Sequence, residues 1–230
     1  MRSTRTDSMA RRWLAGLARL SAVAAVAATV GTLAGLAGGP AVSVAHAQAG
    51  GTAQTIADHF SKVQTMAGEF VQFGPRGEQT GGKFYIQRPG KVRFNYDGKA
   101  GYKVVADGKS VVIENAKMKT ADLYPLSKTP LKLLLDERID LSGSRVQQVT
   151  EDPDLTTIVL ADKSVFGNSR ITMMFDPKSY DLRQWTITDA QGKDTTVMIF
   201  NVQNGVRLDP AFFEIDYAKV SEKNQAMGQR

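Results

Sequence analysis

The sequence predicts a mainly β domain, built as an antiparallel meander, with one helix before the strands and a short helix among them. Three observations predict this fold class. Apolar and polar residues alternate over several short runs, which is typical of strands with one buried face. Turn residues separate the runs at intervals of about eight to twelve residues. Two other segments have apolar residues at helical spacing instead.

The alternation is clearest in two neighbouring runs, 83–87 and 91–96, where every second residue is apolar. Asp107-Gly108 and Asn204-Gly205 are turn pairs that tolerate positive φ and favour tight hairpins. Later strands are predicted at 145–150, 156–161, 170–175, 182–188 and 195–202. Because the connections between strands are short, neighbours along the chain should pair antiparallel.

The first helix is predicted over residues 52–66, where Ile56, Phe60 and Val63 recur on one face. This amphipathic pattern ends near Gly68, where the period changes to two. The helix should therefore place its apolar face against the sheet that follows it.

A second, shorter helix interrupts the strands near the middle of the chain. Thr129 is a favourable N-cap residue, and Pro130 suits the first helical position. Leu131, Leu134 and Leu135 then fall at i, i+3 and i+4 on one face. The pattern predicts a short apolar helix inserted into a β-rich chain.

Residues 1–47 have the layout of a secretory signal peptide that is removed from the mature protein. Five Arg residues come first, an apolar run follows at 20–37, and Ala45-His46-Ala47 gives a cleavage site before Gln48. A transmembrane anchor is the alternative, but the Gly and Ala content and the cleavage site disfavour it. The general secretory route fits better than a twin-arginine route. Residues 48–230 are then one domain, exported across the inner membrane of a bacterium.

Composition excludes several functional classes. The leader holds five of the 29 basic residues and one of the 23 acidic residues, so the remainder has a net charge of about +2, and nucleic-acid binding is not expected. The chain has no Cys, hence neither a disulfide nor a lipid-acceptor thiol. His59 is the one histidine after the leader. We therefore expect no catalytic residues, no metal site and no cofactor.

Several segments together resemble a known family. The most specific runs Gly82-Lys83-Phe84-Tyr85-Ile86-Gln87-Arg88-Pro89-Gly90, and it is flanked by Phe70-Val71-Gln72, by Val105-Ala106-Asp107-Gly108 and by Thr129-Pro130-Leu131. In this order the sequence resembles LolA, the family of periplasmic carriers of outer-membrane lipoproteins. The resemblance extends roughly from Thr52 to Asp216.

The resemblance implies an incomplete, strongly curved antiparallel β-barrel, closed by a short-helix lid around a hydrophobic cavity. It implies a monomeric periplasmic chaperone that takes acylated lipoproteins from an inner-membrane lipoprotein-releasing ABC transporter and passes them to an outer-membrane receptor. It assigns to Arg88 the role of a latch that bonds to the lid and keeps it shut when empty. The sequence departs from the family at Val92, where a larger apolar residue is usual, and in its short, polar end after Asp216.

The residues themselves supply the apolar surfaces that such a barrel needs. The predicted cavity wall consists of Phe84, Ile86, Val92, Phe94, Ile171, Met173, Phe175, Trp185, Ile187, Val197 and Ile199. The predicted lid residues are Ile56, Phe60, Val63, Leu131, Leu134 and Leu135. The alternation alone fits an ordinary filled core equally well, because alternating apolar residues normally reflect packing.

The same scaffold also fits other functions. A lipoprotein receptor of this fold would carry a lipid-anchoring Cys, which this chain lacks. A sensor of mislocalised lipoproteins would need a second domain. A carrier or sensor of another envelope amphiphile, such as a glycolipid or a lipid, is the alternative that the sequence does not separate from a lipoprotein carrier.

Overall fold

The structure is a computed structural model that describes residues 44–99, 101–138, 145–161, 163 and 167–228. The chain divides into two units, 1–41 and 42–230, and all described residues belong to the second. Most of the predicted leader, residues 1–43, lies outside the described residues, so its removal stays a prediction. Among the described helices, none combines the length and the apolar character needed to cross a membrane.

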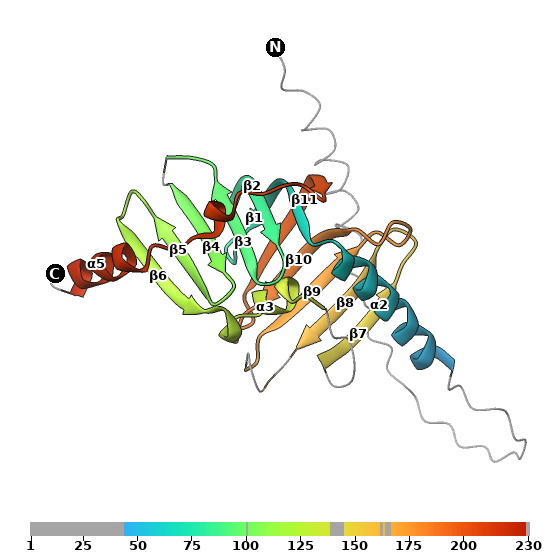
Figure 1. Cartoon of the computed structure of the whole chain (residues 1–230). Helices are drawn as coiled ribbons and strands as arrows, with labels where there is room; N and C mark the ends of the chain where they lie inside the picture. The colour runs from blue at the N-terminus through green and yellow to red at the C-terminus, as the bar shows by residue number, and fades with distance from the viewer. Residues whose placement is uncertain (1–43, 100, 139–144, 162, 164–166, 229–230) are drawn as a thin grey trace, which may run out of the picture. The chain divides into compact units, whose positions relative to one another are not determined.

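The described residues of this unit form eleven strands and several helices (Figure 1). The strands of the first half are β1 (Thr65–Phe73), β2 (Gln79–Gln87), β3 (Lys91–Tyr96), β4 (Tyr102–Asp107), β5 (Ser110–Asn115) and β6 (Thr120–Pro125). Those of the second half are β7 (Val146–Glu151), β8 (Thr156–Ala161), β9 (Arg170–Phe175), β10 (Leu182–Thr188) and β11 (Asp194–Asn204). The helical elements are α2 (Val44–Lys62), η1 (Leu126–Lys128), α3 (Leu131–Leu135), η3 (Pro210–Phe213) and α5 (Tyr217–Gly228).

All eleven strands form one antiparallel sheet in the order β6-β5-β4-β3-β2-β1-β11-β10-β9-β8-β7. Each half is a meander in which neighbours along the chain pair, as the short turns predict. The pairing of β1 with β11 joins the two halves, with Phe70 opposite Ile199. Strands β6 and β7 are the two edges, and the connection between them contains η1 and α3.

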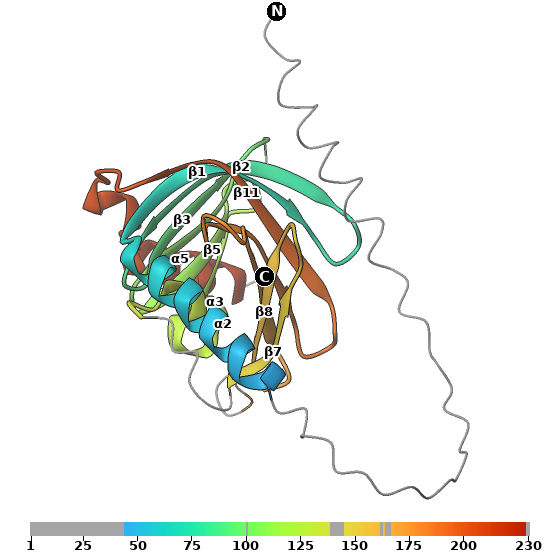
Figure 2. The same cartoon turned by 90° about the vertical axis from the view of Figure 1, so that its right-hand side faces the viewer.

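The sheet is strongly curved and not closed, and α2 and α3 lie across its concave side (Figure 2). We call these two helices the lid. Residues on alternate positions of the strands face the lid and form one large apolar cluster with it. The predicted curved, incomplete barrel with short helices over its open side is therefore confirmed.

Three of the later predicted strands, β8, β9 and β10, have the predicted bounds, and β7 and β11 differ by one or two residues at their ends. Strands β1, β4, β5 and β6 were not individually predicted. The C-terminal helix α5 was also not predicted, because its sequence is mostly polar. It packs on the other face of the sheet through Val220, which is 4 % exposed.

The predicted first helix extends too far. Helix α2 ends at Lys62, and residue 66 already belongs to β1. The side chain of Gln64 turns back and donates to the Ser61 carbonyl, which satisfies an acceptor at the helix end. Val63 still packs against the core, although it lies beyond the helix. The periodic pattern therefore continued past the point where the helix ends.

The cap of α3 also differs from the prediction. Thr129 does not cap the helix: its hydroxyl and its N–H both donate to the Leu126 carbonyl and so close the preceding turn. Pro130, expected at the first helical position, is the N-cap residue. Leu133 is buried beside Leu134 and Leu135, whereas Leu131 is only partly buried. A helix of five residues between two edge strands is buried on more than one side. A pattern that considers one apolar face therefore missed the burial of Leu133.

Candidate functional site

Ten of the eleven predicted wall side chains lie together in the cluster between the sheet and the lid. They are Phe84, Ile86, Val92, Phe94, Ile171, Met173, Phe175, Trp185, Val197 and Ile199. Each is at most 6 % exposed. Cross-strand pairs such as Phe84 with Phe94 and Met173 with Trp185 place these side chains in rows across both halves of the sheet.

Ile187 is the exception among the wall residues, because it is only partly buried and packs at the margin of the cluster. It lies near the end of β10, opposite Thr195 of β11. Its neighbour on the other side is Ile171. The alternation predicted the correct face of the sheet for Ile187. It could not show that the buried part of this face ends near this residue.

The predicted lid residues also join this cluster. Ile56, Phe60, Leu134 and Leu135 are at most 1 % exposed, and Val63 and Leu131 are partly buried. The Phe60 ring meets the wall residue Phe175 edge-on, with 5.6 Å between the ring centroids. In this closed arrangement, lid side chains therefore fill the space under the sheet.

Arg88, directly after β2, lies between the two helices of the lid. Its Nη1 donates to the carbonyl groups of Phe60 and Val63 at the end of α2, at 2.8 Å in the case of Phe60. Its Nε donates to the Leu134 carbonyl in the last turn of α3, at 3.3 Å. The last carbonyls of a helix lack partners within it and carry the negative end of its dipole. One guanidinium thus caps two helices at once.

The surroundings of Arg88 are unusual for a cation. The side chain is 4 % exposed, and its guanidinium carbon lies 3.9 Å from the centroid of the Phe60 ring. Burial lowers the pKa of Arg88 to about 10, so the guanidinium remains charged at neutral pH. Among the described residues its Nη2 has no hydrogen-bond partner. Within the described part of the chain, the charge is stabilised by carbonyl dipoles and by an aromatic face.

Backbone bonds next to Arg88 also tie the lid to the sheet. The Arg88 N–H donates to the Gln64 carbonyl at 2.8 Å, and the Gly90 N–H donates to the Leu135 carbonyl at 2.8 Å. Gly90 has φ +76°, in the left-handed region that favours glycine. The segment Arg88-Pro89-Gly90 therefore contacts the end of both lid helices.

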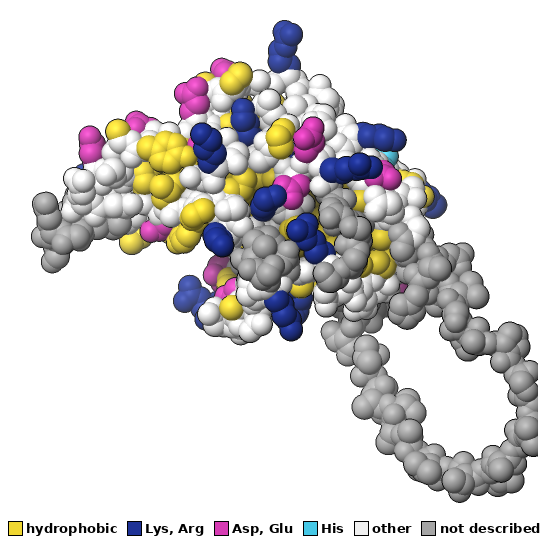
Figure 3. All heavy atoms as spheres, turned by 60° about the horizontal axis from the view of Figure 1, so that its bottom comes forward, with side chains coloured by type: hydrophobic (Ala, Val, Ile, Leu, Met, Phe, Trp, Pro, Cys, Tyr) yellow, Lys and Arg dark blue, Asp and Glu magenta, His cyan; other side chains and the backbone are white. Residues whose placement is uncertain are grey.

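Several apolar residues of the concave side were not predicted. Phe70 of β1 is 1 % exposed and lies 5.0 Å from the ring of Phe94, centroid to centroid. Beyond the lid, the same face continues over β4–β6 as an exposed apolar patch (Figure 3) made of Tyr102, Ile113 and Tyr124. These residues are 37–47 % exposed. The alternation around Tyr102 and Val104 could have indicated the patch, but alternation does not distinguish exposed from covered faces.

Acidic and metal-ligating side chains do not gather at this site. In the described part of the chain, no group of three or more His, Asp or Glu residues is placed to hold a metal ion. His59 of α2 instead meets the Tyr180 ring edge-on, with centroids 6.0 Å apart. What the site offers chemically is a large apolar surface covered by two helices and a buried cation that bonds to both.

Comparison with known proteins identifies the family. The family model described as outer membrane lipoprotein carrier protein LolA matches residues 61–216. An outer-membrane lipoprotein carrier protein of Pseudomonas paraeruginosa is 24 % identical over 186 residues, which cover 76 % of this chain and 88 % of that protein. One of Chromobacterium violaceum is 29 % identical over 178 residues, covering 74 % and 84 %. A crystal structure of a LolA superfamily protein from Nitrosomonas europaea aligns with a TM-score of 0.40 at 9 % identity, over 72 % of this chain and 98 % of that chain. The family match spans more than half of the sequence, and the chain belongs to the LolA family of outer membrane lipoprotein carrier proteins.

Proposed function

We propose that this protein is a periplasmic carrier that binds the acyl chains of lipoproteins between its sheet and its lid and moves them from the inner to the outer membrane. The observation that carries the proposal is the way the lid is attached. Apolar side chains fill the space under the sheet, while Arg88 bonds to the ends of both lid helices. A cover attached at a few polar points can separate from an apolar surface without unfolding the sheet.

Acyl chains can take the place of the lid side chains because both are apolar. Burying each CH₂ group of a chain is worth about 0.8 kcal/mol, so several acyl chains offset the loss of contacts made by Leu134 and Leu135. The exposed patch of Tyr102, Ile113 and Tyr124 lies outside the lid and gives an acyl chain a first contact. No covalent step and no cofactor are needed.

The proposed route has a loading and an unloading partner. An inner-membrane lipoprotein-releasing transporter supplies the acylated cargo, and an outer-membrane receptor accepts it. The carrier works as a monomer in this scheme. Return of Arg88 to the lid carbonyls favours the empty, closed state and so favours release, since the lid and the cargo compete for the same apolar surface.

The test measures binding of an apolar fluorescent probe to the purified protein and its displacement by a triacylated lipopeptide. Phe94→Glu places a carboxylate within the wall and should weaken probe binding at least tenfold, because an unpaired charge is costly to bury. Phe212→Glu is the matched control: Phe212 is 37 % exposed, outside the core cluster. It should bind the probe as the unchanged protein does.

Two results would contradict the proposal. If the unchanged protein does not bind the probe, the apolar cluster is an ordinary filled core. If the lipopeptide does not displace a bound probe, lipoproteins are not the cargo. Mass spectrometry of lipid extracted from protein purified out of the periplasm then identifies another amphiphile, such as a glycolipid.

A further inference from the structure

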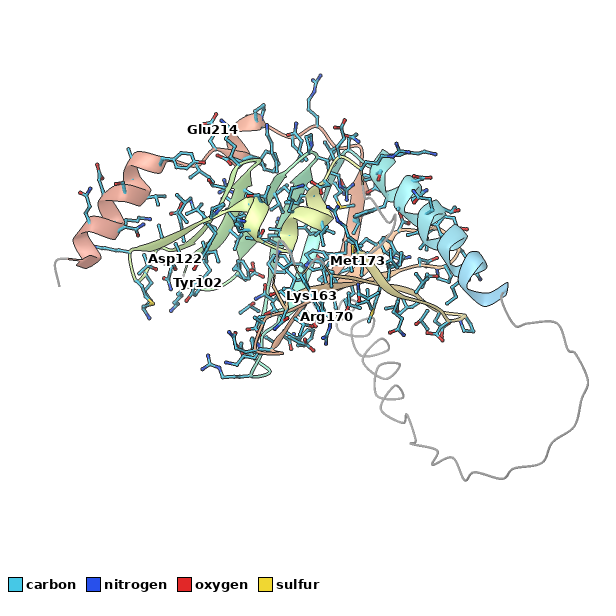
Figure 4. The ribbon with its side chains drawn as sticks, turned by 90° about the horizontal axis from the view of Figure 1, so that it is seen from below. Tyr102, Asp122, Lys163, Arg170, Met173 and Glu214 are labelled. Carbon is cyan, nitrogen blue, oxygen red and sulfur yellow. The ribbon has the colours of Figure 1, made fainter. Side chains whose placement is uncertain are left out.

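The C-terminal segment lies on the face of the sheet opposite to the lid. In Figure 4, Glu214 of this segment lies on the other side of the strands from Tyr102 and Asp122. Helix α5 buries Val220 in a small apolar cluster of its own with Val105, Val112 and Ala121. The Lys223 Nζ pairs with Glu114 of β5 at 2.9 Å. The helix is thus attached to β4–β6 from outside.

Tyr217, the first residue of α5, connects this helix to the turn between β4 and β5. Its hydroxyl donates to Oδ2 of Asp107 at 2.6 Å. The other oxygen of Asp107, Oδ1, accepts the N–H groups of Lys109 and Ser110 at 2.8 and 2.9 Å. Desolvation would raise the pKa of Asp107, but the hydrogen bonds from Ser110, Tyr217 and Lys109 outweigh it and lower the pKa. One carboxylate therefore closes the turn and binds the helix.

The same turn is linked to both ends of the segment Leu126–Leu135, which contains α3. The Lys109 carbonyl accepts the N–H of Leu126, where η1 leads into the lid, at 2.9 Å. A Cβ placed on Gly90 would lie 2.7 Å from the Cα of Gly108, so the two turns touch through their glycines. Gly90 in turn donates to the Leu135 carbonyl at the end of α3. A shift of the turn would alter both attachments of the α3 segment.

We propose that Asp107 is a positioning residue for the lid, and that Tyr217 makes the closed position of the lid depend on the docking of α5. The C-terminal helix then acts on the lid from the opposite face of the sheet, through the β4–β5 turn and without touching the apolar cluster or Arg88. The proposal rests on the proposed function, in which the lid opens. It concerns the lid alone and makes no demand on which cargo is bound.

Amide hydrogen exchange in the purified, cargo-free protein tests this coupling. The Gly90 and Leu126 amides are the reporters. Leu126 donates directly to Lys109 of the β4–β5 turn, and Gly90, which touches Gly108 of that turn, donates to Leu135 at the end of α3. Tyr217→Phe removes only the hydroxyl and should raise exchange at both amides about three- to tenfold. Asp107→Ala should raise it further, and Asp107→Asn should restore part of the protection, because its amide oxygen still closes the turn. Tyr180→Phe, between β9 and β10 in the other half of the sheet, is the matched control, because it also removes one hydroxyl, and it should change neither amide.

Amides of β8–β10 separate positioning from loss of stability, and they should keep their protection in every variant. The proposal is overturned if Gly90 and Leu126 exchange unchanged in Tyr217→Phe and Asp107→Ala, or if the strand amides accelerate by the same factor. Probe binding is read separately. If exchange at the reporter amides rises in the variants but the unchanged protein does not bind the apolar probe, the coupling is supported and the carrier function is contradicted. If the unchanged protein binds the probe but exchange at the Gly90 and Leu126 amides is the same in the variants, the carrier function is supported and the coupling is contradicted.

Discussion

At the scale of single residues, Arg88 does what no other side chain could do at its position. A guanidinium offers several N–H donors in a fixed plane, so it can reach carbonyl groups of two helices at once. Those bonds are formed with Phe60, Val63 and Leu134. A lysine ammonium is a more compact donor on a flexible stem and could not span the same acceptors. One side chain thus connects β2 to the ends of both lid helices.

Arg88→Leu should therefore weaken the closed, empty state, because charge-assisted hydrogen bonds are worth about 1.5–3 kcal/mol each. We expect the variant to accept lipoprotein but to pass it on at least tenfold more slowly, with Arg88→Lys intermediate. The measurement is transfer of bound lipoprotein to its receptor in vitro. Arg183→Leu, at an exposed arginine paired with Asp176, is the control and should transfer normally. Transfer by Arg88→Leu at the unchanged rate would show that no such latch operates.

The residue scale also shows what the sequence could indicate about the site. Alternation along a strand places side chains on one face, so the burial of Phe84 or Met173 followed from the pattern. The contacts of Arg88 did not, because they join backbone groups 25 to 46 residues away in the chain. Only the family resemblance pointed to that residue. Asp107 and Tyr217, 110 positions apart, gave no sign of their contact.

At the scale of elements, the shorter of the two lid helices, α3, is too short to be stable alone. Helix α3 has five residues, well below the length at which isolated helices persist in water. Its conformation therefore depends on packing, which explains why the sequence predicted its place but not its cap or its full set of buried leucines. Tertiary contacts therefore decide the conformation of such a segment.

Leu134 and Leu131 provide a matched pair for testing this dependence. Leu134 is fully buried under the sheet, whereas Leu131 is partly exposed. Leu134→Ala should destabilise the closed state by about 2–5 kcal/mol, and Leu131→Ala should cost clearly less. If cargo displaces the lid, Leu134→Ala should bind the apolar probe more tightly while its thermal midpoint falls. A parallel fall of probe affinity and thermal midpoint would instead place Leu134 in a fixed core.

At the scale of the whole sheet, the decisive contact is the pairing of β1 with β11. Every other pair joins strands that follow each other along the chain, and such pairs are readily predicted from turns. Strands β1 and β11 are the first and last of the described strands, and Met66 pairs with Asn204. The sequence predicted one antiparallel meander, whereas the sheet consists of two. Nothing local in the sequence marks the β1–β11 pairing that joins them.

Gly68 is a position at which the β1–β11 pairing can be tested by mutation. It lies at the irregularity in register between Ala67 and Glu69, and a Cβ there would lie 2.8 Å from Cε1 of Phe84 and 2.9 Å from the carbonyl oxygen of Phe200. One neighbour is a ring of the core and the other is the backbone of β11. The Gly68→Ala change must therefore displace either the Phe84 ring or strand β11. Overpacking of this kind costs about 1–3 kcal/mol.

We expect Gly68→Ala to lower the free energy of unfolding in a urea titration by that amount. Gly51→Ala is the matched control, because Gly51 lies in helix α2 and a Cβ there meets nothing within 4 Å. Alanine is favoured over glycine within a helix by about 0.5–1 kcal/mol, so the control should be slightly stabilised. Both changes add one methyl group. If the free energy of unfolding falls in Gly68→Ala and rises in Gly51→Ala, the loss comes from the β1–β11 pairing and not from the methyl group itself. If Gly68→Ala and the unchanged protein are equally stable, the added methyl group is accommodated without cost, and the close contacts of Gly68 with Phe84 and Phe200 do not constrain the β1–β11 pairing.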